Sequence, residues 1–408
     1  MSTVENPVLF QHIMAPLKTL LKEPEIAAMP DSAIKLTFPR FVDLLLYLCL
    51  KGIDGIRSLC SELKNNPQNV ALADLVVVGV STISDAFARY PLVIVQKLYQ
   101  RLLAQSSLPD IEAFRTLGQL TICGSSLFPI RLTAFWASYR KHVHALKLHL
   151  SFSLNSFLPI CLLTTNGKQD DRKGLRELLE AGVTYIADRG YIAFDLLFAI
   201  VTRTAFFIIR SRKNLCYHVQ QVLTVNLPPA VRWIFLAVTD ERVIFARDRQ
   251  QQVYRRISFQ TRQTRFILLT NRLDLTTYEI IKLYCLRWQV ELFFRYFKQT
   301  MQAKHLVNLS EAGVAIHFYI VLIAHLLLVM FKYQQQQLFL YRQQELQQAR
   351  EEQGKCQTAE RVAFRGTEDF VTAIGKTIPN YLKIKKHERL AICNALLQSA
   401  KQFQFPFT

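Results

Sequence analysis

The sequence predicts an α/β protein in which a mixed β-sheet, with helices on both faces, follows an N-terminal helical region. Three observations support this fold class. Apolar residues before about residue 103 recur at helical spacing, the segment between residues 118 and 210 alternates between strand and helix patterns, and half of the 408 residues are hydrophobic. A chain of this length and composition can bury large cores and is expected to form two or three domains.

The N-terminal region, residues 1–105, is expected to be helical. Apolar residues between Phe38 and Leu63 have helical spacing, and Ser81–Arg89 resembles the start of a capped helix. This Ser/Thr-rich segment ends in arginine and would suit a recognition helix that enters a DNA groove. An ordinary N-capped helix in a bundle explains the same residues, and this segment alone favours that interpretation.

Residues 106–335 show a different pattern. Strands are expected over 118–122, 145–153 and 158–164, then a helix over 170–181, a strand over 183–187, a helix over 192–202 and a strand over 205–210. This order of three strands, helix, strand, helix and strand is that of the ribonuclease-H-like fold. In such sheets, catalytic groups gather at strand ends and on an adjacent helix.

A polar, β-rich insertion is expected over about residues 212–272, with antiparallel strands near 222–225, 233–238, 242–246, 252–254 and 265–269. The later segment Ala312–Phe331 is almost wholly apolar and just long enough to span a bilayer. It contains histidines and lacks aromatic or basic belts at both ends, which favours a buried core helix. Residues 336–408 are expected to form a Gln-rich and basic helical region, with a solvated helix or partly disordered arm over 333–353 and a basic amphipathic helix over 383–401.

The charge balance points to a polyanionic partner. The chain carries 50 Lys and Arg against 31 Asp and Glu, which gives a net charge of +19. Such an excess suits nucleic acid or an anionic membrane surface. The eight cysteines form no CxxC pair and indicate a reducing cytosol, with neither a zinc site nor a disulfide framework.

Polar residues recur along one predicted helix. At about 100° per residue, Tyr284, Arg287, Glu291 and Lys298 fall within an arc of roughly 60°. Asp188 ends a predicted central strand, and Gly190 allows a tight turn behind it. Carboxylates at a strand end and on a facing helix can hold a divalent metal over a phosphodiester. The structural alternatives are a helix-capping aspartate and a solvated Arg–Glu pair.

The pattern Tyr-x2-Arg-x3-Glu-x6-Lys, preceded by Asp-Arg-Gly-Tyr, resembles the signature of bacterial insertion-sequence DDE transposases of the IS-four family. The likeness runs from about Ser81 to Phe331 and includes the sequence Leu-Leu-Thr-Asn-Arg at 268–272. It implies cut-and-paste DNA transposition by two Mg (or Mn) ions held by Asp, Asp and Glu. By position, Asp188 would be the second metal ligand and Glu291 the third.

The same resemblance implies the partners. Arg287 and Lys298 would grip the phosphates of the transposon end, Tyr284 would lie near the same strand, and Arg189 would also contact DNA. The expected partners are double-stranded DNA, as terminal inverted repeats and as target, and a second copy of the chain in a synaptic homodimer. No membrane is expected, and the location would be the bacterial cytoplasm, in association with the nucleoid.

One position departs from the family pattern. The first aspartate is expected at the end of the first strand, but Cys123 precedes Gly124 and Ser125 there. Thiolate is a poor ligand for Mg, which prefers hard oxygens. Asp170 or Asp171 could reach the site instead, although their place at a helix start favours N-capping. The sequence therefore leaves open an active transposase and a catalytically inactive or repurposed DNA-binding protein derived from one. A basic membrane-associated protein is a third interpretation, which rests only on the apolar segment 312–331.

Overall fold

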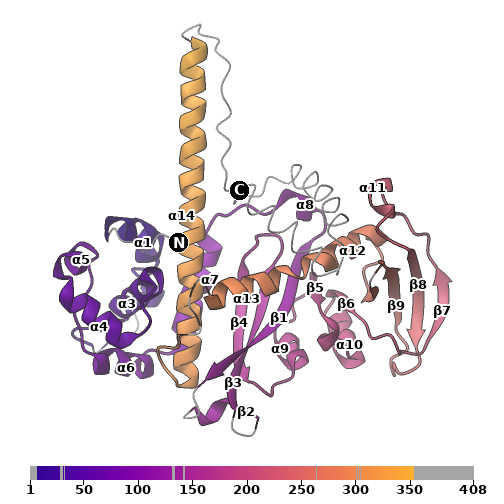
Figure 1. The fold of residues 1–408 in the computed structure, drawn as a ribbon, viewed down its shortest axis with the longest axis horizontal. Helices are drawn as coiled ribbons and strands as arrows, with labels where there is room; N and C mark the ends of the chain where they lie inside the picture. Colours follow the sequence, from indigo (N-terminus) through magenta and orange to yellow (C-terminus); the bar gives the residue numbers. More distant parts are fainter. Residues whose placement is uncertain are drawn as a thin grey trace.

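The computed structural model describes residues 7–27, 31, 33–130, 134–140, 143–262, 264–299, 301, 303 and 305–352. A helical region and a broad mixed β-sheet lie on either side of one long helix, α14 (Glu311–Glu352), whose C-terminal part projects from the body (Figure 1). The helix predicted over 383–401 lies outside the described residues.

The N-terminal helices pack around the first part of α14. They are α1 (Pro7–Leu20), α2 (Pro24–Ala27), α3 (Phe38–Lys51), α4 (Ile56–Asn65), α5 (Pro67–Leu72), α6 (Val80–Arg89) and α7 (Leu92–Gln105). The helical pattern between 38 and 63 is interrupted at Gly52, whose left-handed φ of 68° ends α3. The capped helix predicted at Ser81 is wrong in one respect. α6 begins at Val80 behind Gly79, and no side chain caps it.

The core half of the sheet has the spatial order β4-β3-β1-β5-β6. β1 pairs antiparallel with β3, β3 with β4, and the pairs β1–β5 and β5–β6 are parallel. The bounds are β1 (Gln119–Ile130), β3 (Val143–Ser153), β4 (Pro159–Asn166), β5 (Val183–Ala187) and β6 (Phe206–Arg210), with short β2 (Ser138–Arg140) on β3. The predicted order of elements is confirmed. β1 is longer than predicted because it pairs with β3 along most of its length, from Thr121 to Ile130.

The insertion continues the same sheet. β10 (Arg265–Thr270) pairs antiparallel with β6, and β9 (Val253–Gln260), β8 (Ala237–Phe245) and β7 (Tyr217–Val222) follow outward. The strands predicted over 222–225 and 233–238 are misplaced. Two prolines start the short helix α11 (Pro229–Arg232), and this turn keeps Trp233 out of β8.

Helices cover the two faces of the sheet differently. α9 (Asp171–Glu177) and α10 (Phe194–Thr202) cover one face, whereas α12 (Thr277–Leu286), α13 (Gln289–Gln299) and α14 belong to the core on the other. A further short helix, α8 (Glu112–Arg115), precedes β1. Alternate residues of β1 follow this division, because Ile122 belongs to the α13 core and Cys123 to the α9–α10 core.

One helix, over Glu311–Gln344, is long and apolar enough to cross a membrane, but 72% of its most apolar window is buried inside the protein. It packs on α7, α3 and β4, which is the environment expected of a core helix. Beyond residue 331 the helix carries exposed side chains through Gln344, so the Gln-rich tract begins as a solvated helix.

Candidate active site

Gly124 sets the contact between β1 and α13. A Cβ at this position would lie 2.8 Å from Cγ1 of Val290 and 3.3 Å from Cε2 of Phe294. Only a glycine therefore lets α13 approach the strand so closely. Val290 and Phe294 are themselves buried, so the carboxylate residue between them, Glu291, is placed at the margin of this helix–strand contact.

Asp188 lies directly after β5, at the end of a fully buried strand. Its carboxylate accepts a hydrogen bond of 2.7 Å from the backbone N–H of Gly190 and caps a 3₁₀ turn, η2 (Arg189–Tyr191). Asp188, Arg189 and Gly190 are exposed. The capping role that the sequence allowed is thus present, and the second carboxylate oxygen lies at an accessible strand end.

The helix predicted through Tyr284–Lys298 is wrong as a single element. α12 ends at Leu286, a turn occupies Arg287 and Trp288, and α13 begins at Gln289. Backbone hydrogen bonds from Val290 to Arg287 and from Glu291 to Trp288 span three residues and tighten this turn. The four polar residues consequently do not form one exposed stripe.

The residues of these helices that were predicted to contact DNA make contacts within the protein itself. Tyr284 is fully buried, and its ring lies 6.5 Å from that of Phe266. Lys298 donates from Nζ to the carbonyl of Leu127 at 2.7 Å and lies 4.5 Å above the ring of Phe128. The expectation that Tyr284 lies on an accessible face is therefore wrong, and Lys298 fastens α13 to β1 in this structure.

Arg287 and Glu291 form the ion pair that the spacing allowed. Arg287 Nη2 donates to Glu291 Oε1 at 2.6 Å, and the arginine side chain is 5% exposed whereas the glutamate is 38% exposed. The guanidinium group of Arg287 is therefore buried, whereas the Glu291 carboxylate with which it pairs remains accessible to solvent. A charge-assisted pair of this kind orients Glu291 at the surface.

Cys123 lies on the opposite face of β1 from α13. It is buried with Leu175, Tyr185 and Tyr191 beneath α9 and α10, and burial raises the pKa of its thiol. A neutral thiol in an apolar cluster is not a metal ligand. The neighbouring Gly124 is the β1 residue that faces α13.

The two acidic residues at the start of α9 have separate roles. Asp170 caps the helix by accepting from the N–H of Arg172 at 3.0 Å, as predicted, and it also pairs with the Arg172 side chain. Asp171 lies 3.4 Å from Lys147 Nζ and 3.5 Å from His149 Nδ1. Among the described residues, neither belongs to a group of three or more His, Cys, Asp or Glu side chains able to hold a metal.

Tyr191 is buried in the same cluster as Cys123, and sequence reasoning gave it no role. It is buried, and burial raises its pKa well above the usual value, with smaller effects from Cys123, Asp171 and Asp188, which raise it, and from Arg287, which lowers it. Tyr191 thus belongs both to the apolar cluster that buries Cys123 and to the 3₁₀ turn that Asp188 caps. Its place in the Asp-Arg-Gly-Tyr sequence was the only available signal.

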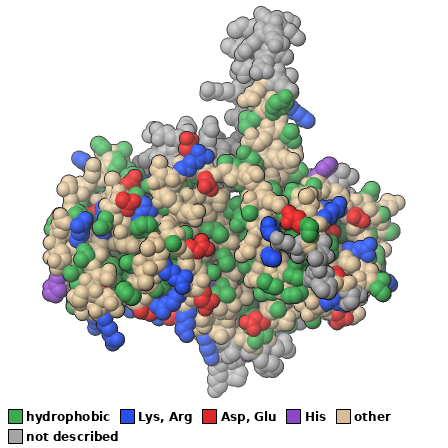
Figure 2. All heavy atoms as spheres, turned by 180° about the vertical axis from the view of Figure 1, so that it is seen from behind, with side chains coloured by type: hydrophobic (Ala, Val, Ile, Leu, Met, Phe, Trp, Pro, Cys, Tyr) green, Lys and Arg blue, Asp and Glu red, His purple; other side chains and the backbone are tan. Residues whose placement is uncertain are grey.

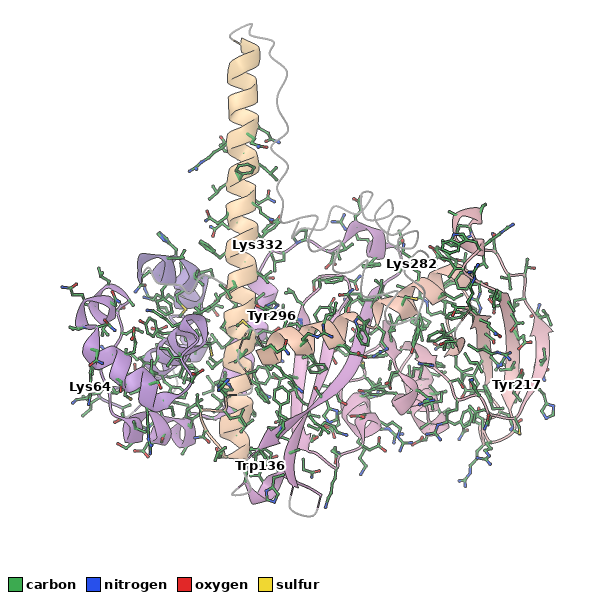
Figure 3. The ribbon with its side chains drawn as sticks, in the orientation of Figure 1. Lys64, Trp136, Tyr217, Lys282, Tyr296 and Lys332 are labelled. Carbon is green, nitrogen blue, oxygen red and sulfur yellow. The ribbon has the colours of Figure 1, made fainter. Side chains whose placement is uncertain are left out.

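Contacts away from the acidic residues hold β5 and α13 against their neighbours. Arg272 donates to Thr184 Oγ1 at 2.6 Å and to the Leu117 carbonyl at 3.0 Å, which ties the end of β10 to β5 and to the approach to β1. Figure 3 labels Tyr296 of α13 beside α14. Its hydroxyl lies 3.4 Å from Nδ1 of His325 on α14. These contacts fix both elements that carry the acidic residues.

Comparisons with known proteins agree with this arrangement. The model of the family described as "Transposase DDE domain" matches residues 121–327, which is just over half of the chain and runs from β1 into α14. An acidic strand end, a facing helix with a glutamate and this match define the class of protein. The chain belongs to the transposase DDE domain family.

Two relatives are transposases by name. The chain is 25% identical over 253 residues to "Putative transposase y4zB" of Sinorhizobium fredii (strain NBRC 101917 / NGR234), an alignment that covers 61% of this chain and 70% of that protein. It is 24% identical over 252 residues to "Probable transposase for insertion sequence element IS5377" of Geobacillus stearothermophilus, with 61% and 66% covered.

Proposed function

We propose that the chain is the transposase of an insertion sequence of the IS-four family, built on a ribonuclease-H-like core, and that it binds the terminal inverted repeats of its element. The observation that carries this proposal is the match of the transposase DDE domain family over residues 121–327, a range that includes both Asp188 after β5 and Glu291 on α13. The family reaction is metal-dependent DNA cleavage and strand transfer in cut-and-paste transposition.

The residues at the three ligand positions do not fit a pair of Mg or Mn ions. Asp188 and Glu291 offer the hard oxygen ligands that these ions prefer. Glu291, however, is paired with Arg287, and the position of the first aspartate is occupied by Cys123, whose buried thiol belongs to the α9–α10 core. Among the described residues, no group of three His, Cys, Asp or Glu side chains is placed to hold a metal ion.

That disagreement favours a second candidate function, namely binding of transposon ends without cleavage. A DDE-derived protein that has lost its first carboxylate lacks a group that places the metals, but it needs no metal to bind DNA. We propose the same partners for both candidates, which are inverted-repeat and target DNA and a second copy of the chain. A cytoplasmic, nucleoid-associated location is proposed on the same grounds.

A nicking assay separates the two candidates. The substrate is duplex DNA that carries the element's inverted repeat, taken from the DNA flanking the gene, incubated with wild-type protein and Mg or Mn. Glu291→Gln is the matched control because it keeps the size of the side chain and removes its charge. Nicks that disappear in Glu291→Gln would establish the cleaving enzyme. Specific binding with no nicks above this control would establish the binding protein.

A further inference from the structure

A cleft of about 770 Å³ lies on the α9–α10 face of the sheet, away from Glu291. One wall is formed by α9 and α10, and the other by the turn between β8 and β9. Four arginines line it, namely Arg176, Arg203, Arg247 and Arg249. In the view from behind, Lys and Arg side chains project along the lower edge of the molecule's left half, the region that α9, α10 and the β8–β9 turn occupy (Figure 2).

The β8–β9 turn is built to present two of these arginines. Asp248 between them is 1% exposed, and its carboxylate accepts from the N–H groups of Gln250 and Gln252 at 3.1 and 2.9 Å and from the Tyr254 hydroxyl at 3.1 Å. The acidic side chain is thus used inside the turn. Arg247 and Arg249 on either side of it are exposed.

The charges on the opposite wall leave the cleft with a net positive charge. Arg176 pairs with Asp195 at 2.8 Å in a largely solvated contact, and Arg203 donates to the Leu179 carbonyl at 3.0 Å. Of the two carboxylates that line the cleft, Asp195 is balanced by this pair and Asp248 is bonded within its turn. Two arginine charges at the β8–β9 turn therefore face the cleft without a lining carboxylate to balance them.

Aromatic contacts hold the two walls of the cleft together. The Phe194 ring lies 5.4 Å from that of Phe245 and 6.2 Å from that of Tyr254, so α10 is packed on the hairpin that carries the arginines. No side chain lining the cleft has a buried polar atom without a hydrogen-bond partner among the described residues. The lining thus offers guanidinium groups and, among the described residues, no unsatisfied buried polar atom that would select a particular small molecule.

We infer that this cleft binds the phosphate backbone of duplex DNA, without regard to sequence, as a second DNA contact of the protein. The guanidinium group can donate to a phosphate bidentately, and backbone contacts of this kind position a protein on DNA without base readout. The inference rests on the proposed function. It adds a DNA contact on the face of the sheet opposite to α12 and α13.

The test compares two variants that lose the same charge. Arg247→Gln/Arg249→Gln removes both turn arginines, and Lys332→Gln/Arg342→Gln removes two exposed cations from α14, away from the cleft. Binding of a random-sequence 30-bp duplex (about three turns) is measured by fluorescence anisotropy over a range of salt. Loss of two phosphate contacts should lower the magnitude of the salt slope by about 1.8 and the affinity at 0.1 M salt by roughly 10- to 60-fold.

The control variant should lose less than about 3-fold, and Arg247→Lys/Arg249→Lys should keep the salt slope because it keeps the charge. Equal losses in the glutamine variant and the α14 control would overturn the inference. So would a loss of binding to phosphatidylglycerol vesicles with unchanged DNA binding, which would assign the arginines to a membrane surface. If wild-type protein binds no duplex at all, the proposed function itself is wrong.

Discussion

Replacement of Gly124 by alanine tests the contact that places Glu291. The new Cβ would meet Val290 Cγ1 at 2.8 Å, Val290 Cγ2 at 3.0 Å and Phe294 Cε2 at 3.3 Å. Overpacking of a filled core costs about 1–3 kcal/mol, and the stiffer unfolded chain offsets about 0.4–1 kcal/mol of this. We therefore expect Gly124→Ala to lower the free energy of unfolding by about 1–2 kcal/mol.

A double-mutant cycle distinguishes a clash from a general defect. Val290→Ala alone removes two buried methyl groups, which costs about 1.5–2.5 kcal/mol including the cavity. In the double variant the alanine at 124 no longer meets a Val290 methyl group, so its combined loss should fall short of the sum by about 1–2 kcal/mol. Urea unfolding followed by tryptophan fluorescence measures all four proteins. If the losses of the two single variants sum to the loss of the double variant within about 0.5 kcal/mol, the proposed helix–strand contact is refuted.

Three further predictions concern buried groups. Arg255 donates to both carboxylate oxygens of the fully buried Asp240. Asp240→Asn would leave the buried charge of Arg255 without its partner and should lower the free energy of unfolding in urea by about 3–5 kcal/mol. A loss under about 1 kcal/mol would contradict this. At pH 8, maleimide labelling read by mass spectrometry should modify exposed Cys216 rapidly and Cys123 only after unfolding, since Cys123 is buried with a raised thiol pKa; equal labelling of the folded protein would contradict the burial. Burial raises the pKa of Asp43 from 3.8 to about 6, so the free energy of unfolding should fall as pH rises from about 4 to 6. Asp43→Asn should remove this pH dependence and raise the free energy of unfolding at pH 7.5 by up to about 3 kcal/mol. A pH profile that the substitution leaves unchanged would contradict this.

The sequence was most informative where a single pattern determined the structure. The buried run Val183–Ala187 could only be an interior strand, so Asp188 was correctly expected at its end. The spacing from Arg287 to Glu291 allowed their ion pair as the structural alternative to a metal ligand, and the pair is present. In both cases the determining interactions are local along the chain.

The remainder depended on tertiary packing. Apolar periodicity continues unbroken through Arg287 and Trp288, so it could not reveal the turn between α12 and α13. The direction of the Cys123 side chain follows from the register of β1, which the close approach of α13 to Gly124 defines. The arginine cleft joins α9 and α10 to a hairpin some 50 residues later, and no local pattern connects these segments.

Selective binding of transposon ends is the most direct test of the proposed function. Wild-type protein is titrated against a duplex with the element's terminal inverted repeat and against a scrambled duplex of the same length and composition, at one salt concentration. Specific protein–DNA complexes are typically at least about 10³-fold tighter than non-specific ones, so we predict a clear preference, of at least about 100-fold, for the repeat. Equal affinity for the two duplexes would contradict the assignment as a protein that recognises transposon ends.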